Sequence, residues 1–428
     1  MMWMVASLAG CGDDVLTGQI ESRDDAEVAD TSPADTADTN DSADAPAVDT
    51  VDTTPAADTM ADSADTTTTD TTDTVPADTT DTVPADTVPA DTIDTTPADT
   101  SVEVDAIPTG CAPAACERGS LPDIGTVSDW RHPIATGFVT LQGGQRHRGR
   151  DLYLREGDDA WALAKFAYGA FDDDLVDEDV DIWLLRDCAD ARTGDDDWEL
   201  LGTATTTDDG DHDPVEGVED SGGWVYFPIP KTASLGLGRH LVLFVVRGDH
   251  SLAEQRIEVL PADAKFVVSD VDGTQTESEM AEFTAVFLGT DPAAQPHGAE
   301  ALWAFAARGY HIFYLTARPE WLTTRTHEWL LDHGYPPGLV HTTMTFTGSF
   351  GNAAIDFKSG ELAVVDGRFA DGVRYAIGNT DTDEAGFQNA GVPNTYLYQF
   401  DPTSWGTRID DYATLVPIAQ AAPDVCTP

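Results

Sequence analysis

The chain has 428 residues and a formal net charge of −56, with 78 acidic residues against 22 lysines and arginines. This length suggests two or three domains. So acidic a protein is a poor ligand for nucleic acid, because a phosphate backbone binds to a basic face.

Residues 1–11 form a short apolar run that ends in LAGC, from Leu8 to Cys11. This pattern resembles a bacterial lipoprotein signal, in which the cysteine is lipidated after cleavage. The resemblance implies that Cys11 anchors the protein to a membrane of the bacterial cell envelope (the outer membrane or the cell surface), with the folded domains outside the cytoplasm. Two features depart from the pattern: the run is short, and no positive charge precedes it.

Residues 12–110 consist largely of Asp, Thr, Ala and Pro, with 26 acidic residues, one basic residue and no aromatic residue. Near-repeats such as TTDTVPADTTDTVPADT run through this segment. Such a composition cannot bury enough apolar surface to offset chain entropy. We therefore predict a disordered acidic tether between the lipid anchor and the folded domains.

Residues 118–262 predict an all-β domain. Segments such as FVTLQG, VDIWLLRD and GRHLVLFVVRGD alternate between apolar and polar residues or run apolar, and turns rich in Gly, Asp and Pro separate them. We count about seven or eight short strands and no helical segment, which is typical of a β-sandwich.

From residue 263 to about residue 420, strands alternate with helices. Strand KFVVSD precedes a helix around PHGAEALWAFAARGY, and strand HIFYLT precedes a helix over PEWLTTRTHEWLLDHGY. Strand VRYAIGN, a short helix and strand NTYLYQF follow. This alternation predicts an α/β Rossmann-like domain, with a parallel sheet covered on both faces.

Polar side chains follow three of these strands. Asp270 and Asp272 end the first strand, Thr316 ends the second, and the segment GNTDTD, Gly378–Asp383, ends a later one. Lys358 lies between the last two in the sequence. Because ligands bind at the carboxyl ends of parallel strands, we expect these side chains to converge at one edge of the sheet.

These residue types fit phosphoryl transfer with magnesium. Asp270 and Asp272 would repel each other when both are ionised, and Mg²⁺ would relieve that repulsion. We assign Asp270 as the nucleophile and Asp272 as the acid and then the base. Thr316 and Lys358 would hold the phosphoryl oxygens. Asp270, the backbone carbonyl of Asp272, and Asp383 would bind the metal ion.

Four nearby residues are assigned to substrate binding. Gly273 would let the backbone turn sharply beside the phosphate. Thr274 follows it, with capping of the turn as its alternative role. Arg318 and Arg325 lie where a lipid phosphate or headgroup could meet them, and salt bridges within an acidic protein are the alternative for both.

The segment DVDGT at Asp270–Thr274, together with Thr316, Lys358 and GNTDTD, resembles the four motifs of the haloacid dehalogenase superfamily of phosphatases. More narrowly, Lys265 to about Phe400 resembles the lipin catalytic domain and the C-terminal domain of the membrane-associated phosphatidylinositol transfer proteins. The β half resembles the domain that precedes this one in related proteins. The likeness implies a haloacid dehalogenase fold with a minimal cap.

The resemblance points to two different functions. Lipins hydrolyse phosphatidate with Mg²⁺ through the aspartate pair, whereas the transfer-protein domains have lost the first aspartate and bind phosphatidate without hydrolysing it. Because Asp270 and Asp272 are both present, we favour a phosphatidate phosphatase. A phosphatidate-binding module that targets membranes and a phosphatase for small soluble phosphoesters are the alternatives. Asn379 departs from the aspartate of the general superfamily pattern, although lipins also have Asn there.

Four cysteines besides Cys11 predict two disulfides in an exported protein. We favour Cys116–Cys188 within the β half and Cys111–Cys426 across both domains, because Cys426 lies beyond the phosphatase domain and the other three lie in or just before the β half. The swapped pairing, and Cys111–Cys116 with Cys188–Cys426, are the other possibilities.

Overall fold

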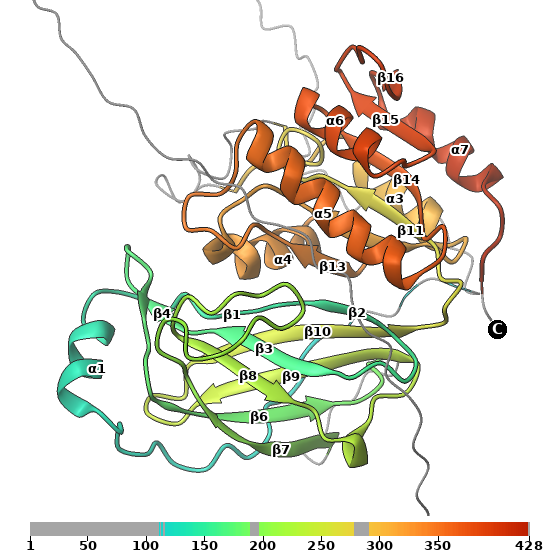
Figure 1. Cartoon of the computed structure of the whole chain (residues 1–428). Coiled ribbons are helices and arrows are strands. Elements are labelled where there is room, and N and C mark those ends of the chain that lie inside the picture. Colours follow the sequence, from blue (N-terminus) through green and yellow to red (C-terminus); the bar gives the residue numbers. More distant parts are fainter. Residues whose placement is uncertain (1–110, 112, 114–115, 189–196, 278–290, 427–428) are drawn as a thin grey trace, which may run out of the picture. The chain divides into compact units, whose positions relative to one another are not determined.

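The computed structural model describes residues 111, 113, 116–188, 197–277 and 291–426 (Figure 1). The predicted signal, Cys11 and the tether all lie outside these residues. Within the part of the chain that is described, no helix has the length and apolar character needed to cross a bilayer.

The first half is the predicted β-sandwich. A three-stranded sheet, β1-β3-β8, faces a five-stranded sheet, β2-β10-β9-β6-β7, in which only the β2–β10 pair is parallel. Strand β9 is buried on both faces: Val242 and Phe244 face the other sheet, while Leu241 and Leu243 pack under the segment that contains Cys116. The strands are β1 (Arg148–Gly149), β2 (Leu152–Arg155), β3 (Trp161–Lys165), β4 (Ala167–Tyr168), β5 (Asp173–Asp174), β6 (Asp179–Leu185), β7 (Trp198–Thr205), β8 (Trp224–Pro228), β9 (Gly238–Val246) and β10 (Leu252–Leu260).

One element contradicts the prediction that this half has no helix. Helix α1 spans Pro133–Thr140 and takes up residues that were predicted to start a strand. Its start depends on Glu178, a buried residue far along the chain, which accepts hydrogen bonds from the N–H groups of Arg131 and His132 and from the Thr136 hydroxyl. The local apolar pattern of the segment could not reveal this contact, so the helix was missed.

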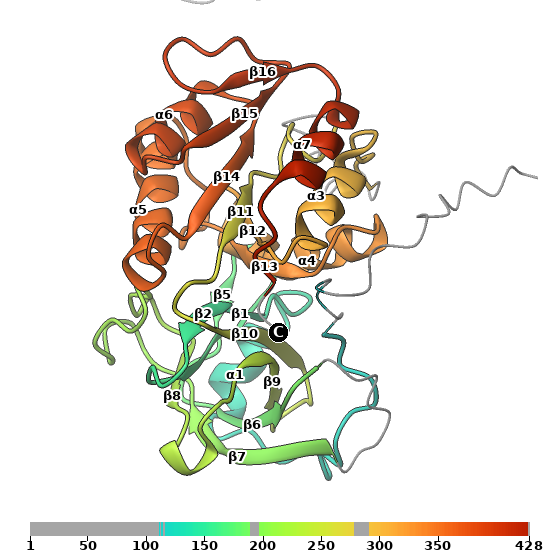
Figure 2. The same ribbon diagram turned by 90° about the vertical axis from the view of Figure 1, so that its right-hand side faces the viewer.

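The second half is a six-stranded parallel sheet in the order β13-β12-β11-β14-β15-β16. Figure 2 shows α5 and α6 on one face of the sheet and α3, α4 and α7 on the other. Alternate residues of β11 serve the two faces, since Val267 packs against α3 and Val268 packs against α5. The elements are β11 (Phe266–Ser269), α3 (Gly298–Ala306), β12 (His311–Leu315), α4 (Thr323–Asp332), β13 (Gly338–His341), α5 (Asn352–Arg368), β14 (Val373–Gly378), α6 (Asp381–Asn389), β15 (Asn394–Tyr398), β16 (Thr407–Ile409) and α7 (Leu415–Ala421).

The predicted strands and helices of this half are present, and four further elements were not predicted: β13, α5, β16 and α7. Helix α5 was missed because its buried face, Ala354, Lys358, Leu362 and Val365, carries a lysine where the helical pattern needs an apolar residue. Residues 278–290, between β11 and α3, lie outside the described residues.

The two halves share a buried interface around Asp151, which precedes β2 and is 1% exposed. Its carboxylate accepts hydrogen bonds from Arg256 N (2.8 Å) in β10 and, across the interface, from His327 Nε2 (2.8 Å) and Val340 N (3.0 Å). Burial alone would raise the pKa of Asp151, but attraction to His327 and these hydrogen bonds lower it to about 2. An apolar cluster that includes Tyr153 and Phe313 extends the interface.

Both disulfides have the favoured pairing. Cys116 is bonded to Cys188, with Cα atoms 4.8 Å apart. Cys111 is bonded to Cys426, with Cα atoms 5.7 Å apart and a sequence separation of 315. In loop-entropy models a closure of this length stabilises the folded state by about 5–6 kcal/mol. The second bond ties the tail after α7 to the segment that leads into the sandwich.

Replacing Asp151 by Ala should lower the free energy of unfolding by about 3–5 kcal/mol, because two backbone N–H groups and His327 would lose a buried charged partner. Chemical denaturation at neutral pH measures this. The control is Asp159→Ala, since the Asp159 side chain is 73% exposed and pairs with Lys231 at the surface. Equal stability of the two variants would show that the Asp151 interface does not hold the halves together.

Candidate active site

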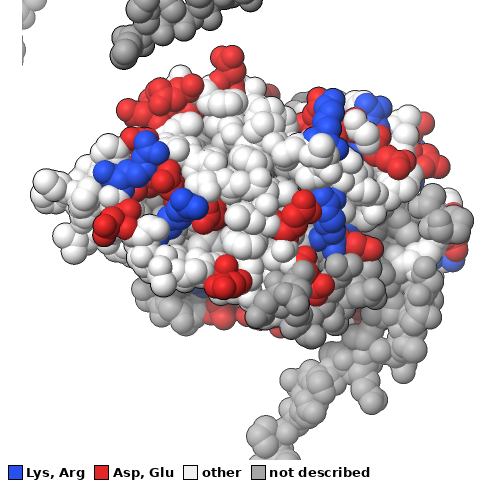
Figure 3. Space-filling model, turned by 90° about the horizontal axis from the view of Figure 1, so that it is seen from below, with Lys and Arg blue, Asp and Glu red and all other residues white. Residues whose placement is uncertain are grey.

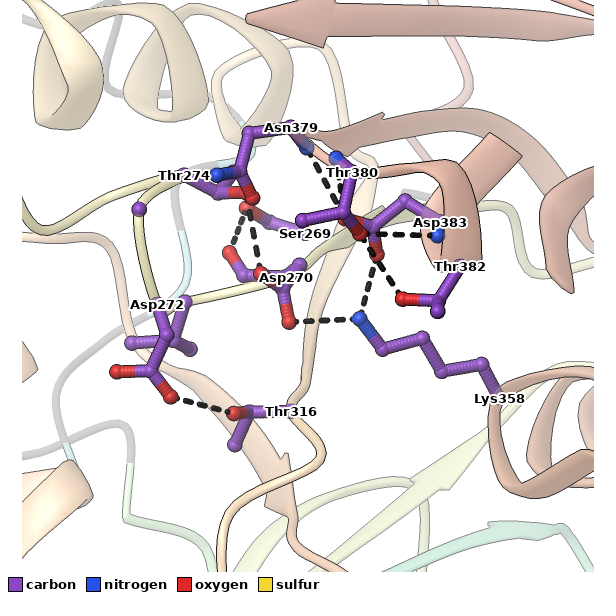
Figure 4. Close-up of polar contacts among 12 residues, drawn as sticks. Ser269, Asp270, Asp272, Thr274, Thr316, Lys358, Asn379, Thr380, Thr382 and Asp383 are labelled. Carbon is purple, nitrogen blue, oxygen red and sulfur yellow. Dashed lines mark hydrogen bonds and ion pairs between the residues drawn. The ribbon is translucent and has the colours of Figure 1, made fainter. Parts of the chain in front are cut away.

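Strands β12, β11 and β14 are neighbours, so their carboxyl ends lie side by side. Asp270 follows β11, Thr316 follows β12 and Asn379 follows β14. Asp270 N donates to Ile377 O (2.9 Å), which continues the β11–β14 ladder by one residue and fixes where the aspartate lies. Figure 4 shows the polar contacts that result.

Lys358, from α5, lies between two buried carboxylates. Its Nζ donates to Asp270 Oδ1 (2.9 Å) and Asp383 Oδ1 (2.5 Å). Burial raises the pKa of Asp270 to about 7; the charge of Lys358 opposes this shift, while Asp383 and Asp272 add to it. Burial would lower the pKa of Lys358, but the two carboxylates outweigh it and raise that pKa. The site therefore contains an excess of acidic groups over its one lysine.

Asp383 is fixed by the start of α6. Thr380 caps the helix, and its hydroxyl and the Asp383 side chain form a reciprocal capping box. Asp383 Oδ2 accepts from Asn379 N (3.0 Å) and Thr380 N (3.1 Å), while Oδ1 accepts from Lys358. A side chain at Gly378 would not fit, because a Cβ there would lie 2.5 Å from the Asp383 Cβ. Both carboxylate oxygens of Asp383 are thus already in use.

Asn379 is a contributor that the sequence analysis did not assign to the site. The Thr274 hydroxyl lies 2.7 Å from Asn379 Oδ1 and 3.1 Å from Asp270 Oδ2, so both of these oxygens contact the same hydroxyl group. The position of Asn379 directly after β14 was the signal that could have identified it. Tyr412 was also missed, and its hydroxyl donates to Thr274 O (2.6 Å).

Gly273 and Thr274 form the turn after the aspartate pair. Gly273 has a φ of 67°, in the left-handed region that favours glycine, and its N–H donates to Thr276 Oγ1 (3.0 Å). This turn lets Asp272 leave the sheet while Thr274 returns to Asp270. The role of both residues in substrate binding stays a prediction.

Asp272 is held by Arg318. The guanidinium donates from Nε to Asp272 Oδ2 (2.8 Å) and from Nη2 to Oδ1 (2.7 Å), and a third donation reaches Thr326 Oγ1 (2.8 Å). The Thr316 hydroxyl lies 3.3 Å from Asp272 Oδ2. Because the Arg318 side chain is 1% exposed and used in this way, the salt-bridge alternative describes it better than substrate binding.

Arg325 also forms a salt bridge, from Nη2 to Asp291 Oδ1 (3.2 Å), and its side chain is about one-third exposed. This salt bridge of Arg325 is therefore made with Asp291 and not with Asp270. As with Arg318, its pairing matches the alternative interpretation of the sequence.

The oxygen atoms at the strand ends fit a magnesium ion. Asp270, Asn379 and the backbone carbonyl of Asp272 are the hard oxygen donors that Mg²⁺ prefers. A cation would also compensate the charge of three acidic side chains, Asp270, Asp272 and Asp383, that share one lysine and one arginine. Asp383 would contribute to the metal site in one of two ways. It would act indirectly, through its contact with Lys358, or it would bind the ion itself after Lys358 moves away from it.

Two family models match the described chain. Residues 145–259 match the β-sandwich domain of PITM 1-3, and residues 267–400 match the LNS2 domain of PITM 1-3. The folded chain is a β-sandwich domain followed by an LNS2 domain. This confirms the resemblance to the membrane-associated phosphatidylinositol transfer proteins and assigns the second half to the haloacid dehalogenase phosphatase-type fold.

Curated relatives include the mouse membrane-associated phosphatidylinositol transfer protein 2, which is 30% identical over 195 residues, or 45% of this chain and 13% of the relative. The Drosophila protein retinal degeneration B is also 30% identical, over 45% of this chain and 14% of its own length. The chain thus spans a small part of these relatives.

Similar solved structures include a putative haloacid dehalogenase-like phosphatase from Mesorhizobium loti, at 15% identity and a TM-score of 0.31, covering 38% of this chain and 89% of that one. Another is D,D-heptose 1,7-bisphosphate phosphatase from B. bronchiseptica, solved with magnesium and phosphate, at 14% identity and a TM-score of 0.29, covering 37% of this chain and 99% of that one.

Asp270→Asn should make the metal-free LNS2-containing chain more stable at pH 8. The pKa of Asp270 is raised in the folded state, so the folded state binds the proton more tightly than the unfolded state, and wild-type stability falls as the pH rises from about 4 to about 7. The asparagine of the variant does not titrate, so the variant does not lose stability in this way as the pH rises. Thermal unfolding with a chelator present measures the difference, which should vanish near pH 4.

The control for this experiment is Asp381→Asn, an exposed residue in the same segment. Added Mg²⁺ should raise the melting temperature of the wild type more than that of Asp270→Asn. The raised pKa of Asp270 would be contradicted by a wild type whose stability stays constant from pH 4 to 7. An Asp270→Asn variant that is less stable than the wild type at pH 8 would contradict it as well.

Proposed function

We propose that the protein is a Mg²⁺-dependent phosphomonoesterase that acts through a phosphoryl intermediate on Asp270, with phosphatidate as substrate and diacylglycerol as product. One observation carries the proposal. The Asp270 carboxylate is buried and fixed by Lys358, and Asp272 is held at the same strand end, so that a nucleophile and a proton donor are both present. The LNS2 match agrees with the likeness to lipins and to the transfer-protein domains, and that likeness is the reason for proposing phosphatidate as the substrate.

The reaction would run in two displacements. In the first, a carboxylate oxygen of Asp270 attacks phosphorus, the bond from phosphorus to the ester oxygen breaks, and the leaving oxygen takes a proton from Asp272. In the second, Asp272 removes a proton from water, the water oxygen attacks phosphorus, and inorganic phosphate leaves Asp270. A bound Mg²⁺ would neutralise charge on the phosphoryl oxygens.

The residues around the aspartates would assist each step. Lys358 and Thr316 would donate to the phosphoryl oxygens as charge develops on them. The bidentate contact from Arg318 stabilises the ionised form of Asp272, which suits the second displacement, when Asp272 accepts a proton. For the first displacement Asp272 has to carry a proton, so this contact has to loosen before the leaving oxygen is protonated.

Asp270→Asn should lower turnover of phosphatidate by at least about a thousandfold, because it removes the nucleophile. Phosphate release from phosphatidate in detergent micelles, and from a small aryl phosphate, measures turnover in the presence of Mg²⁺. Binding of phosphatidate should change much less. Asp381→Asn serves as the control and should keep wild-type turnover.

Each result of this experiment has a consequence. Near wild-type hydrolysis by Asp270→Asn would exclude an aspartyl-phosphate intermediate. Wild-type activity on the aryl phosphate but not on phosphatidate would favour the phosphatase for soluble phosphoesters. Binding of phosphatidate without turnover of either substrate would favour the membrane-targeting module.

We also propose that the protein is lipid-anchored through Cys11 in a bacterial cell envelope. The support is the LAGC pattern, the long acidic segment after it, and the two disulfides, which are typical of exported proteins. Cys11→Ser should move the protein from the membrane fraction to the soluble fraction of cells. A wild-type protein that is already soluble after export would contradict the anchor.

A further inference from the structure

Large apolar side chains are exposed on three elements: helix α1, the β4–β5 hairpin, which α1 contacts, and the loop between β13 and α5. Helix α1 and the residue after it expose Ile134, Phe138 and Leu141, with Leu141 84% accessible. The β4–β5 hairpin exposes Phe171 (79%), and the loop between β13 and α5 exposes Phe346 and Phe350, with Phe350 74% accessible. We call this set of six side chains the apolar rim: Ile134, Phe138, Leu141, Phe171, Phe346 and Phe350.

Specific contacts join the sandwich part of the rim to the phosphatase part. Arg148 pairs with Asp172 (2.6 Å), next to Phe171 in the hairpin, and with Glu320 (2.8 Å) in the phosphatase domain. The guanidinium of Arg146 lies 4.3 Å above the ring of Trp321, and the Trp321 ring N–H donates to Phe346 O (2.9 Å). These contacts connect the hairpin that carries Phe171 to the loop that carries Phe346.

The rim borders the candidate active site. Ser349 N, in the loop that carries Phe346 and Phe350, donates to Ala317 O (3.0 Å), and Ala317 lies between Thr316 and Arg318. In Figure 1, α1 and the β4 hairpin occupy the side of the sandwich toward which the carboxyl end of β11 points. The apolar side chains and the proposed substrate site thus lie on the same side of the folded part of the chain.

The rim offers apolar surface without a basic patch. Helix α1, PIATGFVT, contains no charged residue. In Figure 3 the tip of the left-hand end is white, and the lysines and arginines behind it lie next to acidic residues. Contact with a partner through α1 would therefore bury apolar surface and would depend little on salt.

We propose that the apolar rim inserts into the interfacial layer of a lipid bilayer and holds the active site against the membrane. This rests on the proposed function, because the acyl chains of phosphatidate stay in the bilayer and its phosphate must be reached at the surface. A helix, a hairpin and a loop protrude separately, and a fluid bilayer accepts separate apolar side chains together, whereas a protein partner would need a matching surface for each.

The length of chain before Cys111 agrees with a membrane as the partner of the apolar rim. The predicted tether of 99 residues separates the proposed lipid on Cys11 from Cys111. A flexible coil of 99 residues has an r.m.s. length of about 50–60 Å, and repulsion between like charges lengthens an acidic one. A lipid anchor would thus keep the apolar rim within reach of the membrane, and weak insertion of a few side chains would suffice to orient the site.

The test uses the full chain with Cys11→Ser, so that the proposed lipid anchor does not contribute to binding. Binding to phosphatidylcholine vesicles, with and without a minor fraction of phosphatidate, is measured by co-sedimentation at low and high salt. We expect binding to both kinds of vesicle, nearly independent of salt. The variant Phe138→Ser with Phe350→Ser should bind at least about tenfold more weakly, since two large side chains no longer insert. Val364→Ser, an exposed apolar residue on α5, is the matched control.

Turnover separates this inference from the proposed function. The double variant should keep wild-type activity on a small soluble aryl phosphate and lose activity on vesicle phosphatidate in proportion to binding. Equal vesicle binding by the double variant and the wild type, or no binding by the wild type, would overturn the membrane contact. Self-association of the wild type that the double variant abolishes would assign the rim to a second copy of the chain. Absence of turnover by the wild type on every substrate, with its vesicle binding intact, would instead refute the phosphatase and leave the membrane contact standing.

Discussion

The candidate active site depends on one buried ion pair network, in which Lys358 lies between Asp270 and Asp383. Without the lysine, two carboxylates would be buried close together, and burial together with mutual repulsion would favour their protonated forms. With it, Asp270 is fixed in one orientation, although the pKa of its carboxyl is still raised to about 7. The same lysine joins α5 to α6, so the packing of the two helices and the chemistry of the site are set together.

The sandwich supports the site as well as extending the surface around it. Glu320, which follows the Thr316–Arg318 segment, is buried against Arg148 and Lys165 from β1 and β3. Asp151 binds β13 and α4 through Val340 and His327. The loop that holds Asp272 through Arg318 is therefore braced by charged groups of the other domain. A sandwich that is only a spacer would not need these buried contacts.

Much of the fold could be predicted from the sequence, because periodicity follows from burial on one or two faces. The change from strands alone to strands alternating with helices gave both domains. The method failed where a distant residue decides the local structure. Glu178 starts α1, and Lys358 interrupts the buried face of α5.

The sequence by itself determined which chemical groups are available and where along each strand they occur. The acids, the hydroxyl and the amide after β11, β12 and β14 had to meet, because neighbouring parallel strands end at the same edge. Only the tertiary structure decided their partners. Arg318 clamps Asp272, Thr274 faces both Asp270 and Asn379, and the apolar rim forms from three separate segments. These contacts join residues far apart in the chain, and no local pattern of polar and apolar residues records which of them come together when the sheet and the sandwich pack.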